Sequence, residues 1–393
     1  MAVLKTGWRS TASAPLILLA LAAVAVAGAA PAVGSGTVSA SSRRPSIISV
    51  QTRFLLSPYP LVRGLQALNG QSLAYIAQPT EGRPISDVVV ADTNHWTRRT
   101  VAHGWGPGIG LSQDWVVWDT VYSQLPEPTW NIHALNRISG RQFVVDSSKL
   151  EGPDPSSGQF PVLSLHGDVL AWNYFVCRGK CAVGKGNYSG SHVAWMNLDD
   201  RTRHVVVSNP PSCNAMFPSI WGNILVWHQE GNCRGRAGSD VMMRNLSSER
   251  NRQLTHNHIS SEPVTNGKYV AWSQGGSRFN SGPVVLLNLS TGGPATVSLS
   301  CATDSPQRCQ HPTVNSTAGA PAIGSDVLAW GTSFPEGVFV RDLSTGREYE
   351  VRSGGSHVAL YTSYLATPWK HNVVWKEARA GVNRPIFGIA TVP

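Results

Sequence analysis

The 393-residue sequence predicts an all-β protein made of one four-stranded unit repeated seven times, and three observations support this. Charged residues make up only 14% of the chain, whereas Gly (38), Pro (26) and Trp (14) are abundant, which suits short strands joined by turns. One apolar strand pattern recurs, as in "DWVVWDT", "DVLAWNY", "KYVAWSQ" and "NVVWKE". The aromatic residue within this pattern returns every 43 to 58 residues, so a repeat architecture is expected.

The recurrent aromatic residue defines the strand order of each unit. It occupies seven positions, namely Tyr75, Trp118, Trp172, Trp227, Trp272, Trp330 and Trp375. It ends a strand that follows a tight turn such as "NGQS" or "WGN", in which Gly suits a positive φ angle. A variable loop then leads to an apolar strand ending in Asn or Asp, and a second turn leads to a final strand such as "REYEVR". Each unit is therefore four antiparallel strands, named a to d.

Four strands in a unit of about 50 residues predict a seven-bladed β-propeller. A single sheet of this size cannot bury both faces, so the strand-b aromatic is expected to pack between neighbouring blades. The last unit, "YLATPWKHNVVWKEARAGVNRPIFGIATVP", supplies strands a, b and c only. We expect "SIISVQTRFLL" (46–56) to pair with "IFGIATV" (386–392), which closes the ring and removes an open edge. Six or eight blades are the alternatives if a loop hides further strands.

Two features of the units carry a family resemblance. The segment "NLSSER" followed by "RQLT", and the opening of Gly turn, strand and Trp, resemble the TolB-like (WD40-like) propeller repeats of exported bacterial proteins. The resemblance covers about residues 65–393. It implies an exported propeller of that superfamily.

The N-terminus predicts export. Lys5 and Arg9 precede the apolar run 14–30, which ends in small residues, so we expect a signal peptide (1–30) cleaved after Ala29. A flexible tether (31–45) and one propeller domain (46–393) follow. The alternative is an uncleaved anchor, although 17 apolar residues are short for a span that needs about 20. The expected location is secreted or periplasmic.

The charge and cysteine content point to partners and compartment. The net charge is +9, and the basic residues are scattered along the sequence. A protein, peptide or acidic glycan partner is expected. A nucleic-acid partner is not expected, because export separates the protein from cellular nucleic acid. No cofactor, no stable membrane span after signal cleavage, and a monomer are expected. Six cysteines in an oxidising compartment predict disulfides, and their spacing favours Cys177–Cys181, Cys213–Cys233 and Cys301–Cys309 among fifteen possible pairings.

The long connections predict a binding face. Strands alternate direction, so b–c and d–a connections share one face, and the long ones are 120–129, 174–191, 228–239, 274–283, 207–217 and 300–319. All six cysteines fall in these segments, and function is usually carried by such loops. The candidate ligand-binding residues are Asp119, Asn173, Tyr174, His228, Glu230, Arg234, Lys376 and Glu377. The other interpretation is that the disulfides only steady long secreted loops, and that these side chains are solvated.

Catalytic motifs are absent from the sequence. It contains no G-x-S-x-G, H-E-x-x-H, Walker A, EF-hand or sialidase-type box. The spacing of Gln253, His256 and His258 is similar to the metal ligands of oligogalacturonate lyases, and His228 is expected nearby. The leading hypothesis is therefore an exported, non-catalytic propeller scaffold that binds through its loop-rich face. The alternative is a propeller enzyme, a metal-dependent lyase or hydrolase, that acts on an anionic polysaccharide.

Overall fold

The computed structural model describes residues 51–57, 61–78, 86–104, 106, 108–122, 129–148, 161–177, 188–208, 213–231, 233, 237–275, 283–297, 321–333, 336–353, 358–360, 368–379 and 385–392. All of them belong to one compact unit, Arg43–Pro393. The expected signal peptide (1–30), the tether (31–45), Cys181, Arg234, Cys301 and Cys309 lie outside them. Within the described ranges every regular element is a strand, so no helix there is long and apolar enough to cross a bilayer.

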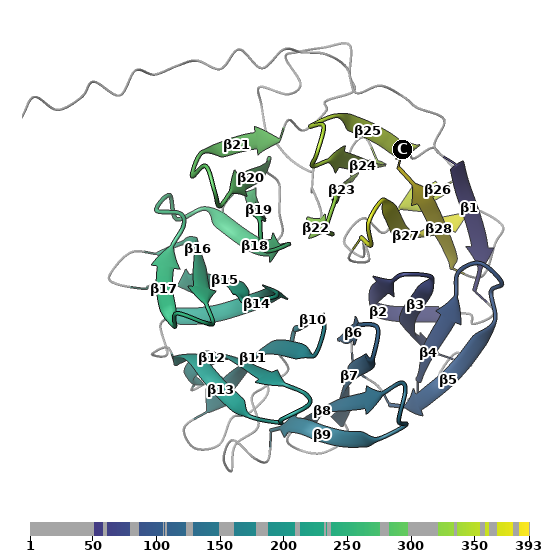
Figure 1. The fold of residues 1–393 in the computed structure, drawn as a ribbon, viewed down its shortest axis with the longest axis horizontal. Coiled ribbons are helices and arrows are strands. Elements are labelled where there is room, and N and C mark those ends of the chain that lie inside the picture. Colours follow the sequence, from purple (N-terminus) through teal and green to yellow (C-terminus); the bar gives the residue numbers. More distant parts are fainter. Residues whose placement is uncertain are drawn as a thin grey trace, which may run out of the picture. The chain divides into compact units, whose positions relative to one another are not determined.

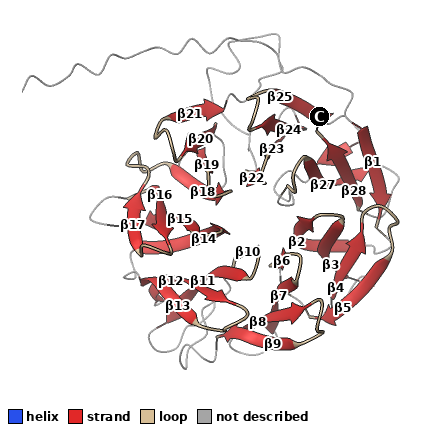
Figure 2. Ribbon diagram, in the orientation of Figure 1, coloured by secondary structure: helices blue, strands red, loops and turns tan. Residues whose placement is uncertain are grey.

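Seven four-stranded antiparallel sheets form a ring, which confirms the seven-bladed propeller (Figure 1; Figure 2). Blade 1 is β2 (Leu61–Asn69), β3 (Ser72–Gln78), β4 (Asp87–Asp92) and β5 (Arg98–His103); blade 2 is β6 (Ile109–Leu111), β7 (Trp115–Tyr122), β8 (Thr129–Asn136) and β9 (Gln142–Ser147). Blade 3 is β10 (Leu163–His166), β11 (Val169–Cys177), β12 (Tyr188–Asn197) and β13 (Arg203–Ser208); blade 4 is β14 (Cys213–Trp221), β15 (Ile224–Gly231), β16 (Ser239–Asn245) and β17 (Arg250–Gln253). Blade 5 is β18 (Ser260–Thr265), β19 (Tyr269–Gln274), β20 (Val284–Asn288) and β21 (Pro294–Val297). Blade 6 is β22 (Ala322–Ile323), β23 (Val327–Ser333), β24 (Glu336–Asp342) and β25 (Glu348–Ser353).

Blade 7 contains both ends of the propeller. Its order is β26 (Val358–Leu360), β27 (Asn372–Arg379), β28 (Ile386–Thr391) and β1 (Gln51–Leu56), so the N-terminal strand supplies strand d as predicted. Strand a lies further upstream than expected, because β26 pairs with the far end of β27. Within the described residues 368–371, the segment immediately before β27 contributes the isolated bridge Trp369↔Asn372. Gly388 allows the close approach of the indole, since a Cβ there would lie 2.1 Å from a Trp375 ring atom.

The pairing of β1 with β28 gives the first prediction. Ser57 N donates to Pro385 O, so the antiparallel alternation places the N–H of Arg53 toward its register partner Ile389. The Arg53 side chain is exposed. We expect Arg53→Pro to lower the free energy of unfolding by about 2 kcal/mol, because it removes one ladder hydrogen bond. Urea unfolding measures this change. Arg53→Ala is the matched control, with an expected loss below about 0.5 kcal/mol, and equal losses in both variants would contradict this pairing.

The core of the ring lies between its blades. Seven apolar clusters each combine residues of two consecutive blades, including one that joins blade 7 to blade 1. The strand-b aromatics take part in all seven, and each is at most 3% exposed. Trp118, for example, packs on Ala67, Ile76 and Val88 of the preceding blade. The repeated Trp therefore acts as an inter-blade packing residue, as predicted.

The turns on one face are short, and their residues explain why. Gly70, Gly167, Gly222 and Gly267 take positive φ in the a–b turns, and Lys370 takes the same conformation (φ 51°) in blade 7. The Asn or Asp that ends strand c accepts backbone N–H groups of the c–d turn, as Asp92 does from Asn94 and His95. We call this surface, formed by the a–b and c–d turns, the short-turn face.

Candidate functional site

The opposite surface carries the b–c and d–a connections, and we call it the loop-rich face. Strands extend into several of its predicted loops, because β7 continues to Tyr122, β11 to Cys177 and β15 to Gly231. The predicted loop 207–217 is largely strand, since β14 begins at Cys213. The connections on this face are therefore shorter than expected, and 300–319 lies outside the described residues.

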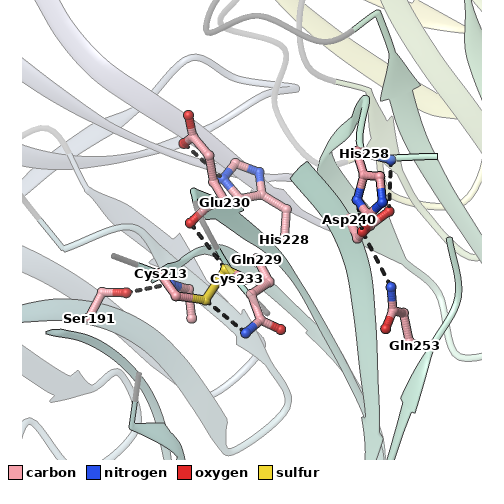
Figure 3. The surroundings of a disulfide bond; sticks show 10 residues. Ser191, Cys213, His228, Gln229, Glu230, Cys233, Asp240, Gln253 and His258 are labelled. Carbon is pink, nitrogen blue, oxygen red and sulfur yellow. Dashed lines mark hydrogen bonds and ion pairs between the residues drawn. A yellow bond between two sulfur atoms is a disulfide. The ribbon is translucent and has the colours of Figure 1, made fainter. Parts of the chain in front are cut away.

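A disulfide joins Cys213 to Cys233 at this face (Figure 3). Cys213 is buried and pairs with Gly231 across the sheet, so the chain curls back immediately after β15 to bring Cys233 within 5.0 Å (Cα–Cα). Gln229 Nε2 donates to Cys213 Sγ (2.9 Å), and Gly231 N donates to Gly238 O (2.9 Å). These contacts hold the start and the end of the b–c connection of blade 4 against its own sheet.

His228 follows Trp227 on β15 and is buried. Its Nδ1 accepts the backbone N–H of Glu262 from blade 5 (3.0 Å), so the proton of the neutral ring lies on Nε2. Nε2 lies 3.9 Å from Glu230 Oε2, and the ring packs against Phe217 with the two ring planes tilted by 46°. Burial lowers the pKa of His228 to about 3, so the ring is neutral near pH 7. His228 therefore links blades 4 and 5, while the Glu230 side chain is 26% exposed at the rim of the face.

The three histidines of the predicted metal set have different surroundings. His258 donates through Nδ1 to Asp240 Oδ2 (2.8 Å) and through its backbone N to Asp240 Oδ1 (3.1 Å). Gln253 Nε2 also donates to Asp240, and His256 is exposed. Figure 3 shows His258 at Asp240 and His228 at Glu230, well separated in the view. Over the described ranges no group of three or more His, Cys, Asp or Glu side chains is placed to hold a metal ion.

The residue after the strand-b Trp is committed to holding strand a in blades 2 and 3. Asp119 Oδ1 accepts the N–H of Gly108 (2.7 Å), and Asn173 Oδ1 accepts the N–H of Val162 (3.2 Å). Asp119 is fully buried, and its Oδ2 has no hydrogen-bond partner among the described residues. Burial raises the pKa of Asp119 to about 8, so this carboxyl is largely protonated near neutral pH.

Asp119 gives a pH-dependent prediction. Its pKa is raised on folding from 3.8 to about 8, so its contribution to stability is complete below pH 4 and is lost as pH rises toward 8. Asp119→Asn keeps the acceptor for Gly108 but cannot ionise. Relative to the wild type, we expect this variant to gain at least about 1 kcal/mol between pH 4 and pH 8.5, measured by urea unfolding. The exposed Asp200→Asn is the control, and a pH-independent difference for Asp119→Asn would contradict the assignment.

The remaining predicted ligand residues are buried in two networks. Tyr174 lies in the core between blades 2 and 3, where its hydroxyl accepts from Arg203 Nη2 (2.7 Å). Arg203 Nε also lies 3.5 Å from the buried Asp146, which accepts the indole N–H of Trp172 (2.7 Å). The Tyr174 hydroxyl therefore takes part in a network with Arg203 and Asp146 between blades 2 and 3.

The second network lies between blades 6 and 7. Glu377 is fully buried; its Oε2 accepts from Arg352 Nε (3.0 Å) and from Trp375 Nε1 (3.1 Å). Burial lowers the pKa of the neighbouring Lys376 to about 8. Among the predicted ligand residues that the structure describes, only Glu230 has an appreciably exposed side chain; the role of the set in ligand binding stays a prediction.

Sequence reasoning missed the partners of these groups, although one signal was available. Phe217-Pro218 and Glu262-Pro263 stand at the same distance before Trp227 and Trp272. In both cases the register of strand a shifts opposite the Trp, and the residue before Pro takes a positive φ. This bulge directs the Glu262 N–H to His228. The X-Pro dipeptide therefore marks a bulge in strand a in both blades, and in blade 5 the N–H before the proline is accepted by a side chain.

Comparisons with known proteins show the fold. No family model and no curated protein matches the chain. Among solved structures, Pyrococcus horikoshii acylaminoacyl peptidase has a TM-score of 0.56 at 8% identity, over 84% of this chain and 51% of that chain. The chain thus spans about half the length of that peptidase. The β-propeller domain of the Trilobed protease from Pyrococcus furiosus has a TM-score of 0.54 at 8% identity, over 83% of this chain and 94% of that one.

Two further details limit what these structures imply. TolB from Acinetobacter baumannii also matches, with a TM-score of 0.41 at 11% identity, over 81% of this chain and 79% of that chain. At such identities the solved structures establish the propeller fold and no activity. The Trilobed protease propeller has an open velcro topology. In this chain, by contrast, β1 pairs with β28 and completes blade 7.

Proposed function

We propose that this chain is an exported β-propeller scaffold that binds a protein, peptide or glycan through its loop-rich face and does not catalyse a reaction. The fold supports this, because propellers present loops of several blades on one surface. The Cys213–Cys233 disulfide supports an oxidising compartment and a rigid rim on that surface. The expected signal peptide supports export.

The observation that carries the proposal is that the polar side chains below the loop-rich face make contacts within the propeller itself. Asp119, Asn173 and His228 each accept a backbone N–H from a strand a or the residue that precedes one. Glu377 is held by Arg352 and Trp375. These groups stabilise the propeller and are not arranged as a nucleophile with a base. We therefore propose that the ligand contacts Glu230, at the rim of blade 4, together with the predicted residue Arg234.

Binding to a defined anionic polymer tests this assignment. We expect the full chain to bind immobilised polygalacturonate, and Arg234→Gln with Arg236→Gln to weaken the binding at least about tenfold, because Arg234 is a predicted contact and Arg236 is a second cation two positions later in the sequence. The charge-preserving pair Arg234→Lys with Arg236→Lys is the matched control and should bind like the wild type. Unchanged binding in the glutamine pair would remove this rim as the ligand site.

A further inference from the structure

The exposed charged side chains of the propeller are predominantly basic. Among the exposed side chains in the described ranges, the acidic ones are Asp199, Asp200 and Glu249. The basic ones are Arg53, Arg98, Arg99, Arg141, Arg201, Arg250, Arg252, Lys268, Arg347 and Lys370. Basic residues that are scattered along the sequence therefore dominate the exposed charge.

The topology collects most of these cations on the short-turn face. Arg141, Arg201 and Arg347 lie in c–d turns, whereas Lys268 and Lys370 lie in a–b turns. Arg98, Arg99 and Arg250 occupy the first positions of strands d, directly after c–d turns. Every blade contributes at least one of these eight residues, which we call the basic ring: Arg98, Arg99, Arg141, Arg201, Arg250, Lys268, Arg347 and Lys370.

Several acidic side chains at the same turns serve internal contacts. Asp92 and Asp342 each accept two backbone N–H groups of their own c–d turn. Asp168 accepts the indole N–H of Trp115 from the neighbouring blade. These carboxylates are therefore engaged by groups of the propeller itself. The residues of the basic ring are exposed, and two of them also contact aromatic rings: the Arg201 guanidinium lies 4.1 Å from the Phe143 ring centroid and the Lys268 ammonium lies 5.2 Å from the Tyr269 ring centroid. Within the described ranges, the exposed acids on this face lie on blades 3 and 4, whereas the Asp92 side chain on blade 1 is partly exposed (34%).

One apolar side chain projects from the same face. Ile138 is 78% exposed at the tip of the c–d turn of blade 2, next to Arg141. Asn136 fixes this turn by accepting the N–H groups of Ile138 and Ser139. An isoleucine held outward among cations suits the boundary between lipid headgroups and acyl chains.

We propose that the short-turn face docks flat on an anionic lipid surface through the basic ring, with Ile138 entering the interface. Cations from all seven blades can contact a planar surface together, because they share one face and their turns are short. A linear polymer would instead favour a continuous track of cations across the face. Docking in this way directs the loop-rich face away from the lipid, where it is open to a ligand.

Vesicle co-sedimentation of the full chain tests the proposal. We expect binding to phosphatidylcholine vesicles that contain phosphatidylglycerol to exceed binding to phosphatidylcholine alone, and high salt to remove the excess. Replacing Arg141, Arg201, Arg250 and Arg347 by glutamine should weaken binding to the anionic vesicles roughly 600-fold, since each of the four cations near the surface contributes about fivefold. Lysine at the same four positions should preserve binding. The apolar segment 14–30 is common to all variants, so it cancels in these comparisons.

The remaining arms separate lipid from polymer. Ile138→Ser should weaken vesicle binding a few-fold and leave binding to soluble polygalacturonate unchanged. Vesicle binding that ignores the glutamine substitutions would overturn the proposal. Loss of polygalacturonate binding in the glutamine variant, with vesicle binding intact, would assign the ring to a polymer instead. Because Arg234 and Arg236 stay intact in these variants, failure here is distinguishable from failure of the proposed loop-face function.

Discussion

Replacing Trp172 by alanine is expected to lower the free energy of unfolding by about 3–5 kcal/mol. The indole is fully buried between blades 2 and 3, among residues that include Trp130 and Leu163. Its removal leaves a cavity in the apolar cluster through which blades 2 and 3 pack against each other. It also removes a 2.7 Å hydrogen bond to Asp146, which is itself buried. Chemical denaturation, followed by far-ultraviolet circular dichroism, measures the loss.

Two further variants separate packing from hydrogen bonding at this position. Trp172→Phe keeps part of the apolar contacts and removes the indole donor together with some buried volume, so we expect an intermediate loss of about 1–2 kcal/mol. Trp195 is half-buried and stacks on the exposed His204, so Trp195→Ala should cost less than Trp172→Ala. A loss below about 1 kcal/mol for Trp172→Ala would contradict the role of the repeated Trp in holding the blades together.

The second large effect is expected at the ion pair between blades 6 and 7. Arg352→Met removes the cation that lies 3.0 Å from Glu377, whose side chain has no exposed surface. Because a buried carboxylate that loses its cationic partner is costly, we expect a loss of about 3–5 kcal/mol. Methionine retains much of the apolar stem of Arg352. Thermal and urea unfolding of the full chain measure the change.

A neighbouring ion pair supplies the control for this experiment. Arg341 lies 2.9 Å from Glu348 and is exposed to nearly the same extent as Arg352, but its partner is partly solvated. Arg341→Met should therefore cost below about 1 kcal/mol. If both variants lost the same small amount of stability, burial of Glu377 would not be the decisive factor.

The architecture could be predicted because it is encoded by periodicity. The recurring Trp, the Gly turns and the Asn or Asp that ends strand c are local signals, and each repeats in register. Ring closure could be predicted from the same pattern, because the strand expected at 46–56 belonged to no unit and the last unit lacked a strand d. Strand a of blade 7 was misplaced because β26 is only three residues long and has no distinctive pattern.

The candidate site was less predictable, because polar partners depend on contacts between distant residues. Asp119 and Glu377 both follow strand-b Trp residues and were expected at the mouth of the ring. Asp119 instead accepts the N–H of Gly108, and Glu377 pairs with Arg352. The distribution of charge was underestimated from the sequence. The basic residues are scattered along the chain, but the blade repeat places most of the exposed ones on the short-turn face. Both outcomes arise from tertiary packing, which composition does not record.

Product analysis by mass spectrometry tests the central claim, that this propeller binds without catalysis, most directly. The full chain would be incubated with acidic polysaccharides, polygalacturonate among them, with and without divalent metal ions. Intact polymers in every mixture, together with measurable binding to at least one of them, are the result that a scaffold predicts. Polymer cleavage that a chelator abolishes, and that is lost when His228, His256 and His258 are replaced together, would contradict it and assign a metal-dependent polysaccharide-cleaving activity to this propeller.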